Sequence, residues 1–193
     1  ALCAAPITAL LGVLIAYLTI RVQFKGKSFF EFIALLCFAI PGTVAGVSYV
    51  MAFNDAPIYL TGSAVIIVLS MVTRNMPIGM RSAIAGLAQI DVNLEQASQS
   101  LKVSSFKTFL FIILPLLRPA LLSALVTSFV RSMTTMSAII FLVTPNTQVA
   151  TAYILNRVED GDYGMAVAYG ATLIVVMMLV ILGFNKLIDR KGS

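Results

Sequence analysis

A single arginine within a long apolar run is the residue whose chemistry stands out most in this sequence. Arg131 lies about twelve residues into the run 119–143, and at 1.5 Å per residue this places it close to a bilayer midplane. Hydroxyl side chains follow at Thr134, Thr135 and Ser137, where they could line a polar path or bond back to their own helix. A charge at that depth indicates a functional site by default, and a guanidinium suits an anion or an anion-chelated metal. The alternative is a structural arginine that is hydrogen-bonded to its neighbours.

A second polar group is an acidic turn that contains Glu159, Asp160 and Asp162. Carboxylates are the ligands that hard cations prefer, so the turn could receive a metal, although its identity stays unknown. It could equally dock a basic protein surface, or be an ordinary solvated loop.

The sequence predicts no catalytic site. The chain contains no histidine at all, and Ser48 in Gly46-Val47-Ser48 is followed by Tyr49, which departs from a rhomboid-type serine motif. Neither an HExxH helix nor a phosphate-binding lysine loop is present. We therefore expect neither an enzyme nor a cofactor bound by this chain.

The composition indicates a helical membrane protein. Of the 193 residues 60% are hydrophobic and 11% are charged, and the mean hydropathy is +0.99. A helix needs about 20 apolar residues to cross a bilayer. Five runs meet this length, and they predict an all-α polytopic bundle of about five transmembrane helices: 2–20, 30–53, 63–80, 119–143 and 165–185.

The positions of the basic residues predict the orientation of this bundle. With alternate connections assigned to opposite sides, one side carries ten lysines and arginines, whereas the other carries only Arg157. Such an excess marks the cytoplasmic side. We therefore expect the segment between the third and fourth spans, and the C-terminus, to be cytoplasmic.

That cytoplasmic segment is predicted to form two short helices. Asp91 is a suitable N-cap for 92–101, and Ser104 or Ser105 for the helix that follows. Pro115 is expected to end the second helix. A stripe with Leu94 and Leu101 would rest on the bundle, while Glu95 would face the cytoplasm with its polar neighbours. The pattern alone is equally compatible with an amphipathic hairpin at the membrane interface.

The same segment resembles the EAA motif of binding-protein-dependent ABC importer permeases. That motif runs roughly E-A-A-x-x-x-G, then about nine residues, then I-x-L-P. Glu95-Gln96-Ala97 stands for E-A-A, Ser100-Leu101 suits the family, and Ile113-Leu114-Pro115 forms the closing element. Lys102 replaces the usual glycine, so it must adopt a positive φ, or the turn must be built differently.

The resemblance implies a single permease domain over 1–193 with the type I ABC importer core. Helix 92–101 would be the coupling helix, seated on a cytoplasmic ATPase dimer that binds ATP and magnesium. Glu95 would accept hydrogen bonds from a basic residue of that ATPase. The further partners implied are an extracytoplasmic binding protein and a second permease half, in a bacterial inner membrane. Because the chain opens within an apolar run, we expect a fragment or the C-terminal half of a longer permease.

A finer resemblance concerns the cargo. The runs Met133–Leu142 and Ile154–Gly161 are similar to those of ferric-iron importer permeases. The resemblance therefore implies ferric iron as the solute, with thiamine, phosphonate, sulfate or polyamine permeases as alternatives of the same architecture. A channel or secondary transporter would leave the cytoplasmic helix pair unexplained.

Overall fold

The computed structural model describes residues 1–22 and 25–189, and its regular elements are all helices. Five of them are long or span-like: α1 (Ala4–Arg21), α2 (Lys27–Ala39), α4 (Ala64–Leu87), α8 (Arg118–Thr134) and α10 (Tyr163–Asp189). The shorter ones are α3 (Gly42–Phe53), α5 (Val92–Ser100), α6 (Ser105–Thr108), η1 (Phe109–Ile113), α7 (Leu114–Leu116), η2 (Ile139–Phe141) and α9 (Ala150–Glu159). The predicted all-α bundle is confirmed.

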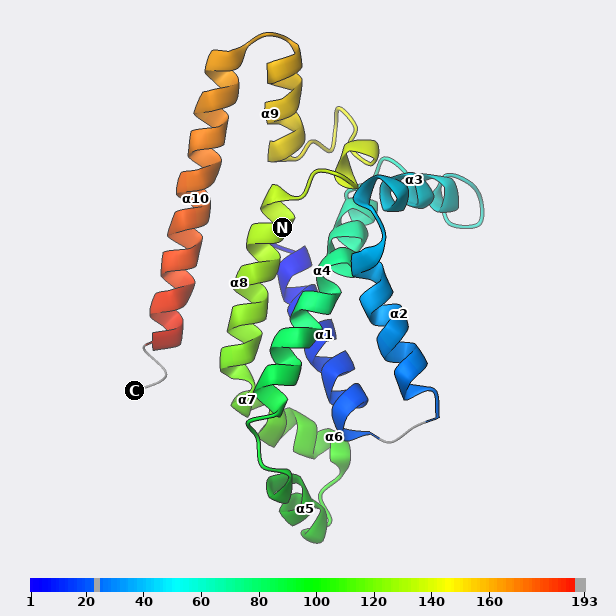
Figure 1. Ribbon diagram of the computed structural model, residues 1–193, viewed down its shortest axis with the longest axis vertical. Coiled ribbons are helices and arrows are strands. Elements are labelled where there is room, and N and C mark those ends of the chain that lie inside the picture. The colour runs from blue at the N-terminus through cyan, green and yellow to red at the C-terminus, as the bar shows by residue number, and fades with distance from the viewer. Residues whose placement is uncertain (23–24, 190–193) are drawn as a thin grey trace.

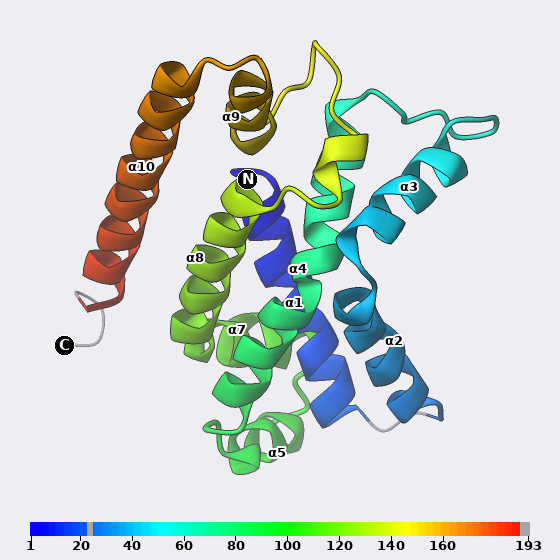
Figure 2. The same ribbon diagram turned by 45° about the horizontal axis from the view of Figure 1, so that its top comes forward.

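Three helices, α1, α4 and α8, form the centre of the bundle, and they lie side by side in Figures 1 and 2. The pair α1 and α4 approaches closely because Gly12 lies against the backbone of Gly79, where a Cβ would have no room. One apolar cluster around Val13, Met80 and Leu117 fills the end of the bundle near α5. A second cluster, around Ile66 and Ile139, fills the opposite end.

The predicted spans correspond to the long helices with some differences. By length and apolar composition, α1 and the Tyr163–Phe184 part of α10 qualify as spans, and two bent helix pairs could each form one more. The predicted span 63–80 lies in α4, which is long enough but not apolar enough to qualify. Because α4 is packed between α1 and α8, it need not present an apolar surface to lipid all round.

The predicted span 30–53 is not one helix. It is divided into α2 and α3, which meet at 106° around Pro41. Ile40 is extended, as the residue before a proline prefers, so the helix ends there. Beyond the bend, Gly42 and Gly46 leave no room for a Cβ against Ser137 and Ala138. These two glycines therefore make a close contact within the chain.

The predicted span 119–143 is also shorter than expected, because α8 ends at Thr134. The apolar residues after it form η2, which packs against the N-terminal half of α4. Arg131 nevertheless lies at mid-depth with respect to α4. Its neighbour Ser132 accepts a hydrogen bond from Asn75, near the middle of that helix, at 3.0 Å.

The C-terminal helices stand apart from the centre. Figure 1 shows α9 and α10 as a hairpin beyond α8, joined at the end of the molecule away from α5. The predicted outer loop 144–164 thus contains a helix of its own. Only 6% of the apolar window of α10 is buried within the chain, so most of this helix is available to lipid or to another subunit.

Candidate coupling segment and arginine-lined cavity

The helix α5 begins and ends as its sequence predicts. Asp91 caps it by accepting a hydrogen bond from the backbone N–H of Asn93 at 2.9 Å. Of the two candidate serines, Ser104 caps the next helix, α6, by accepting from Lys107 N–H at 3.4 Å. Pro115 does not end that helix. The chain continues through the wide turn η1 into α7, and the 71° bend comes at Leu117.

The turn after α5 is left-handed at Lys102, whose φ is 58°. Lys102 N–H donates to Gln99 at 2.8 Å, and Val103 N–H donates to Ser98 at 3.2 Å. These two bonds form a Schellman motif, in which the left-handed position is usually glycine. Of the two expectations for Lys102, the structure thus has the positive φ, at a cost of about 1 kcal/mol relative to glycine.

The left-handed residue also fixes the register of the EAA motif. Counting six residues back from Lys102 places the first motif position at Gln96, and the nine residues that follow Lys102 place I-x-L-P at Ile112–Pro115. The motif is therefore Gln96-Ala97-Ser98, one residue later than the sequence-based assignment. That assignment was wrong because it placed the first motif position at Glu95, seven residues before the left-handed Lys102, whereas the motif has a spacing of six.

The structure reverses the predicted orientation of Leu94, Glu95 and Leu101 in and beside α5. Leu94 and Leu101, expected to rest on the bundle, are 45% and 78% exposed, whereas Glu95 is 8% exposed. Ser98 is buried too, and its hydroxyl lies 2.7 Å from that of Thr108 in α6. Gln96, Ala97 and Ser100 are exposed, and the Ser100 hydroxyl donates to Gln96 O at 3.0 Å. The helix thus turns Glu95 and Ser98 inward, while its exposed surface holds both apolar and polar residues.

Glu95 has a partner within the chain. Its Oε1 lies 2.9 Å from Nε of Arg21, the last residue of α1. The Nη2 atom of the same guanidinium donates to the carbonyl oxygens of Leu87 at 3.2 Å and Ile90 at 2.8 Å. The expectation that Glu95 faces the cytoplasm is therefore wrong. Sequence reasoning missed this contact because Arg21 lies far away along the chain.

Arg131 faces a polar hollow between α2, α4 and the end of α8. Its guanidinium carbon lies 5.5 Å from the centre of the Phe38 ring, in cation–π geometry. Thr134 and Thr135 line the hollow, but both hydroxyls also bond back to backbone carbonyls of α8. Ser137 lies at the same place, and the volume is about 320 Å³.

A second hollow of about 380 Å³ shares Phe38 and Arg131 with the first and adds Arg81. Arg74 lines the first one, and it lies seven residues from Arg81 on one face of α4. No acidic side chain is among the described residues that line either hollow. Together they make an arginine-lined cavity. The seven-residue spacing was the sequence signal that could have added Arg81.

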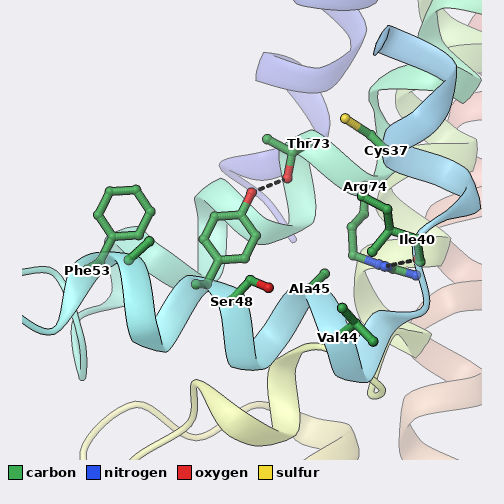
Figure 3. A pocket seen from close by; sticks show the side chains of 10 residues that line it. Cys37, Ile40, Val44, Ala45, Ser48, Phe53, Thr73 and Arg74 are labelled. Carbon is green, nitrogen blue, oxygen red and sulfur yellow. Dashed lines mark hydrogen bonds between the residues drawn. The ribbon is translucent and has the colours of Figure 1, made fainter. Parts of the chain in front are cut away.

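Arg74 also stabilises the bend between α2 and α3. In Figure 3 it reaches Ile40, to whose carbonyl its Nη1 donates at 3.2 Å. The hydroxyls of Tyr49 and Thr73 meet at 2.6 Å across a hollow of about 430 Å³ in the angle of the bend. The lining of this hollow is largely apolar apart from these groups, so it is less suited to a charged solute.

The acidic turn does not form a metal site among the described residues. No three His, Cys, Asp or Glu side chains converge there or elsewhere in residues 1–22 and 25–189. Glu159 ends α9, Asp160 follows it, and Asp162 accepts from Met165 N–H at 3.2 Å at the start of α10. Nearby, Arg157 donates to the Tyr153 hydroxyl at 2.9 Å, which lowers the pKa of that phenol. The metal interpretation thus has no geometric support, while a docking surface stays a prediction.

Comparisons with known proteins agree with this geometry. The chain is 67% identical over 185 residues to the ferric transport system permease protein FbpB of Actinobacillus pleuropneumoniae, which is 96% of this chain and 27% of that protein. It is 65% identical over 150 residues to the putative ferric transport system permease protein FbpB 1 of Haemophilus influenzae, 78% of this chain and 24% of that one. The chain therefore spans about a quarter of the length of these relatives.

The fold has a solved counterpart in a bacterial ABC transporter involved in the import of the acidic polysaccharide alginate. The TM-score is 0.78 at 19% identity, with 100% of this chain and 77% of that chain covered. The profile of the family described as the inner membrane component of binding-protein-dependent transport systems matches residues 9–192. The helical bundle, the Schellman turn in the motif and this match agree, and the chain belongs to that family of multi-pass inner membrane proteins.

Proposed function

We propose that this chain is the translocating part of an ATP-driven importer, and that α5 is the helix that docks on a separate cytoplasmic ATPase. The observation that carries the proposal is the exposure of large apolar side chains at the end of α5 and just beyond it. Leu101 is 78% exposed and Phe106, just beyond the turn, is 72% exposed. An interfacial hairpin would also expose apolar residues to lipid headgroups. The ion pair between Glu95 and Arg21, however, attaches α5 to the bundle. A helix attached in this way is a rigid element, which favours docking of a protein partner over an interfacial hairpin.

The proposal assigns the docking contacts to residues other than Glu95. Gln96 holds the first motif position and is exposed, so it is the polar residue that an ATPase side chain would meet. Ala97 and Leu101 supply the apolar contact, and the Schellman turn at Lys102 holds α5 against α6. ATP and magnesium would be bound by the ATPase, whose closure would move α5 as a rigid body.

The same proposal fixes the sides of the membrane. The end of the bundle with α5 carries most of the basic residues, which supports a cytoplasmic position for this end and for the C-terminus. The opposite end, with α3, α9 and the turn at Glu159, Asp160 and Asp162, would then face an extracytoplasmic binding protein. A second permease half would cover the exposed faces of the bundle.

We infer ferric iron as the cargo from the names of the relatives, and an anionic form of it from the arginine-lined cavity. Three arginines without a described carboxylate among them repel a bare trivalent cation. They attract a chelate or another anion. A simple anion is therefore the second candidate cargo, and the same cavity favours it.

The docking helix is tested by Leu101→Glu in the assembled transporter. Because Leu101 is 78% exposed, the change leaves the fold intact, while a buried charge at a protein interface is strongly unfavourable. We expect the ATPase to stop co-purifying and uptake of iron from ferric-loaded binding protein to be lost. The matched control is Gln89→Glu, which adds the same charge at an exposed position outside the motif. Normal uptake and co-purification in Leu101→Glu would refute the assignment of α5.

A further inference from the structure

One guanidinium joins three elements at the end of the bundle that carries α5. Arg21 belongs to the last turn of α1, it contacts Glu95 of α5, and it donates to two carbonyls at the C-terminal end of α4. The two carbonyls, of Leu87 and Ile90, belong to the end of that helix and to the short link that leads into α5. The contact is therefore placed where a movement of α5 would enter the membrane-spanning helices.

We propose that Arg21 and Glu95 form a positioning pair that transmits the movement of α5 to α1 and α4 together. This proposal rests on the proposed function of α5. A carboxylate that only anchored the helix would need one partner on one span. Here the planar guanidinium uses separate nitrogen atoms for α5 and for the end of α4, so the three elements keep a fixed geometry.

The pair is shielded from water, and the side chain of Tyr17 also interacts with Glu95. The two side chains are 13% and 10% exposed. Arg21 Nε and Glu95 Oε1 are both buried, and neither makes a hydrogen bond of good geometry among the described residues, so they meet as an ion pair. Removal of either side chain would leave its partner as an uncompensated buried charge, which is the costly way to break such a pair.

The surrounding packing keeps the pair in place. Tyr17, one turn before Arg21 in α1, packs against Phe109 with ring centres 4.7 Å apart. Ser98 and Thr108 hold the same face of α5 to α6. The helix α5 is thus attached to α1 through Glu95 and to α6 by a hydroxyl pair, and the attachment through Glu95 reaches the spans.

The test separates ATP hydrolysis from transport. In the complete transporter, with binding protein and ATPase, we would compare Arg21→Gln, Glu95→Gln and the double variant. We expect the complexes to assemble and to hydrolyse ATP, with the ratio of cargo transported to ATP hydrolysed lowered at least about tenfold in each single variant. The double variant should lose no more than the worse single variant, because the two residues act as one unit.

Two control variants remove the same chemistry without removing the pair. Glu31→Gln deletes a carboxylate of α2, and Arg118→Gln deletes an exposed arginine at the start of α8. Neither residue forms an ion pair within the described part of the chain, so transport per ATP should match the wild type. Arg21→Lys covers the case in which neutral variants fail to assemble. It keeps the charge, but a single ammonium cannot reproduce the fork of contacts, so we expect a loss of about threefold.

Wild-type coupling in Arg21→Lys, in Arg21→Gln or in Glu95→Gln would overturn the proposal, and so would additive losses in the double variant. Failure of the positioning pair can be distinguished from failure of the proposed function of α5. If Leu101→Glu abolishes ATPase binding while the Arg21 and Glu95 variants couple normally, only the positioning pair is wrong. If Leu101→Glu is also without effect, α5 is not the docking helix.

Discussion

At the scale of single residues, the conformation of Lys102 explains most about the motif segment. Its side chain adds a Cβ penalty at a left-handed position, yet both hydrogen bonds of the Schellman turn are made. The turn is therefore held by the backbone hydrogen bonds within residues 98–103. A glycine at position 102 would only lower the conformational strain of the turn. This conformation also showed that Gln96, not Glu95, occupies the first position of the motif.

Lys102→Gly should therefore stabilise the segment. Relief of the Cβ strain raises the free energy of unfolding by up to about 1 kcal/mol. The greater freedom of glycine in the unfolded chain offsets part of this gain. The measurement is the thermal unfolding midpoint of the purified transporter, which should rise. Lys107→Gly is the matched control, since it removes the same charge from the interior of α6 and should lower the midpoint. A fall in both variants would contradict the strain at Lys102.

At the scale of elements, the arginine-lined cavity is made by three helices that do not follow one another in the chain. Phe38 comes from α2, Arg74 and Arg81 from α4, and Arg131 from α8. The hydrogen bond between Asn75 and Ser132 holds α4 and α8 in register beside it. The cavity exists because α8 stops at Thr134, which leaves Arg131 near its end rather than enclosed within a longer helix.

Arg131→Gln should reduce uptake at least about tenfold, because a charged hydrogen bond to a bound anion contributes about 1.5–3 kcal/mol. Arg131→Lys should retain more transport, since it keeps the charge while losing the planar fork. The measurement is iron uptake from loaded binding protein at matched amounts of transporter. Arg118→Gln, which removes an exposed arginine outside the cavity, is the control. Unchanged uptake in Arg131→Gln would exclude this residue from the path.

At the scale of the whole molecule, the two ends of the bundle differ in kind. One end holds α5, the Arg21–Glu95 pair and most of the positive charge. The other holds α3, α9 and the acidic turn, and Figure 1 shows them grouped away from α5. The proposed import function needs this division, since cargo would arrive on one side and the ATPase would act on the other.

Cysteine labelling tests the orientation directly. After Cys3 and Cys37 are replaced by alanine, Gln89→Cys and Asn146→Cys each place one exposed thiol at opposite ends of the bundle. A membrane-impermeant maleimide applied to intact spheroplasts should label Asn146→Cys, and it should label Gln89→Cys only after the membrane is opened. The reverse pattern would invert the proposed topology.

Local signals in the sequence predicted the local structure well. Asp91 was predicted as a cap, and Ser104 was one of two candidates for the next, because capping depends on the residue type and the few residues that follow it. The 106° bend around Pro41 is likewise a local effect of one residue type on the chain before it. The direction in which α5 faces was not predictable from its own residues, since its apolar stripe indicated burial and its polar residues indicated solvent. The buried partner of Glu95 is 74 positions away in the sequence.

The sequence by itself determined the membrane character, the helical fold, the charge asymmetry and the family, because these follow from composition, short-range periodicity and a motif of fixed spacing. The tertiary structure decided which residues meet. Arg21 with Glu95, Asn75 with Ser132, and Arg131 with Phe38 are each pairs from different helices. A charged or polar side chain pairs with whichever partner the packing of the helices brings within reach. For that reason the helix α5 and its motif were visible in the sequence, while the attachment of α5 to the spans appeared only in three dimensions.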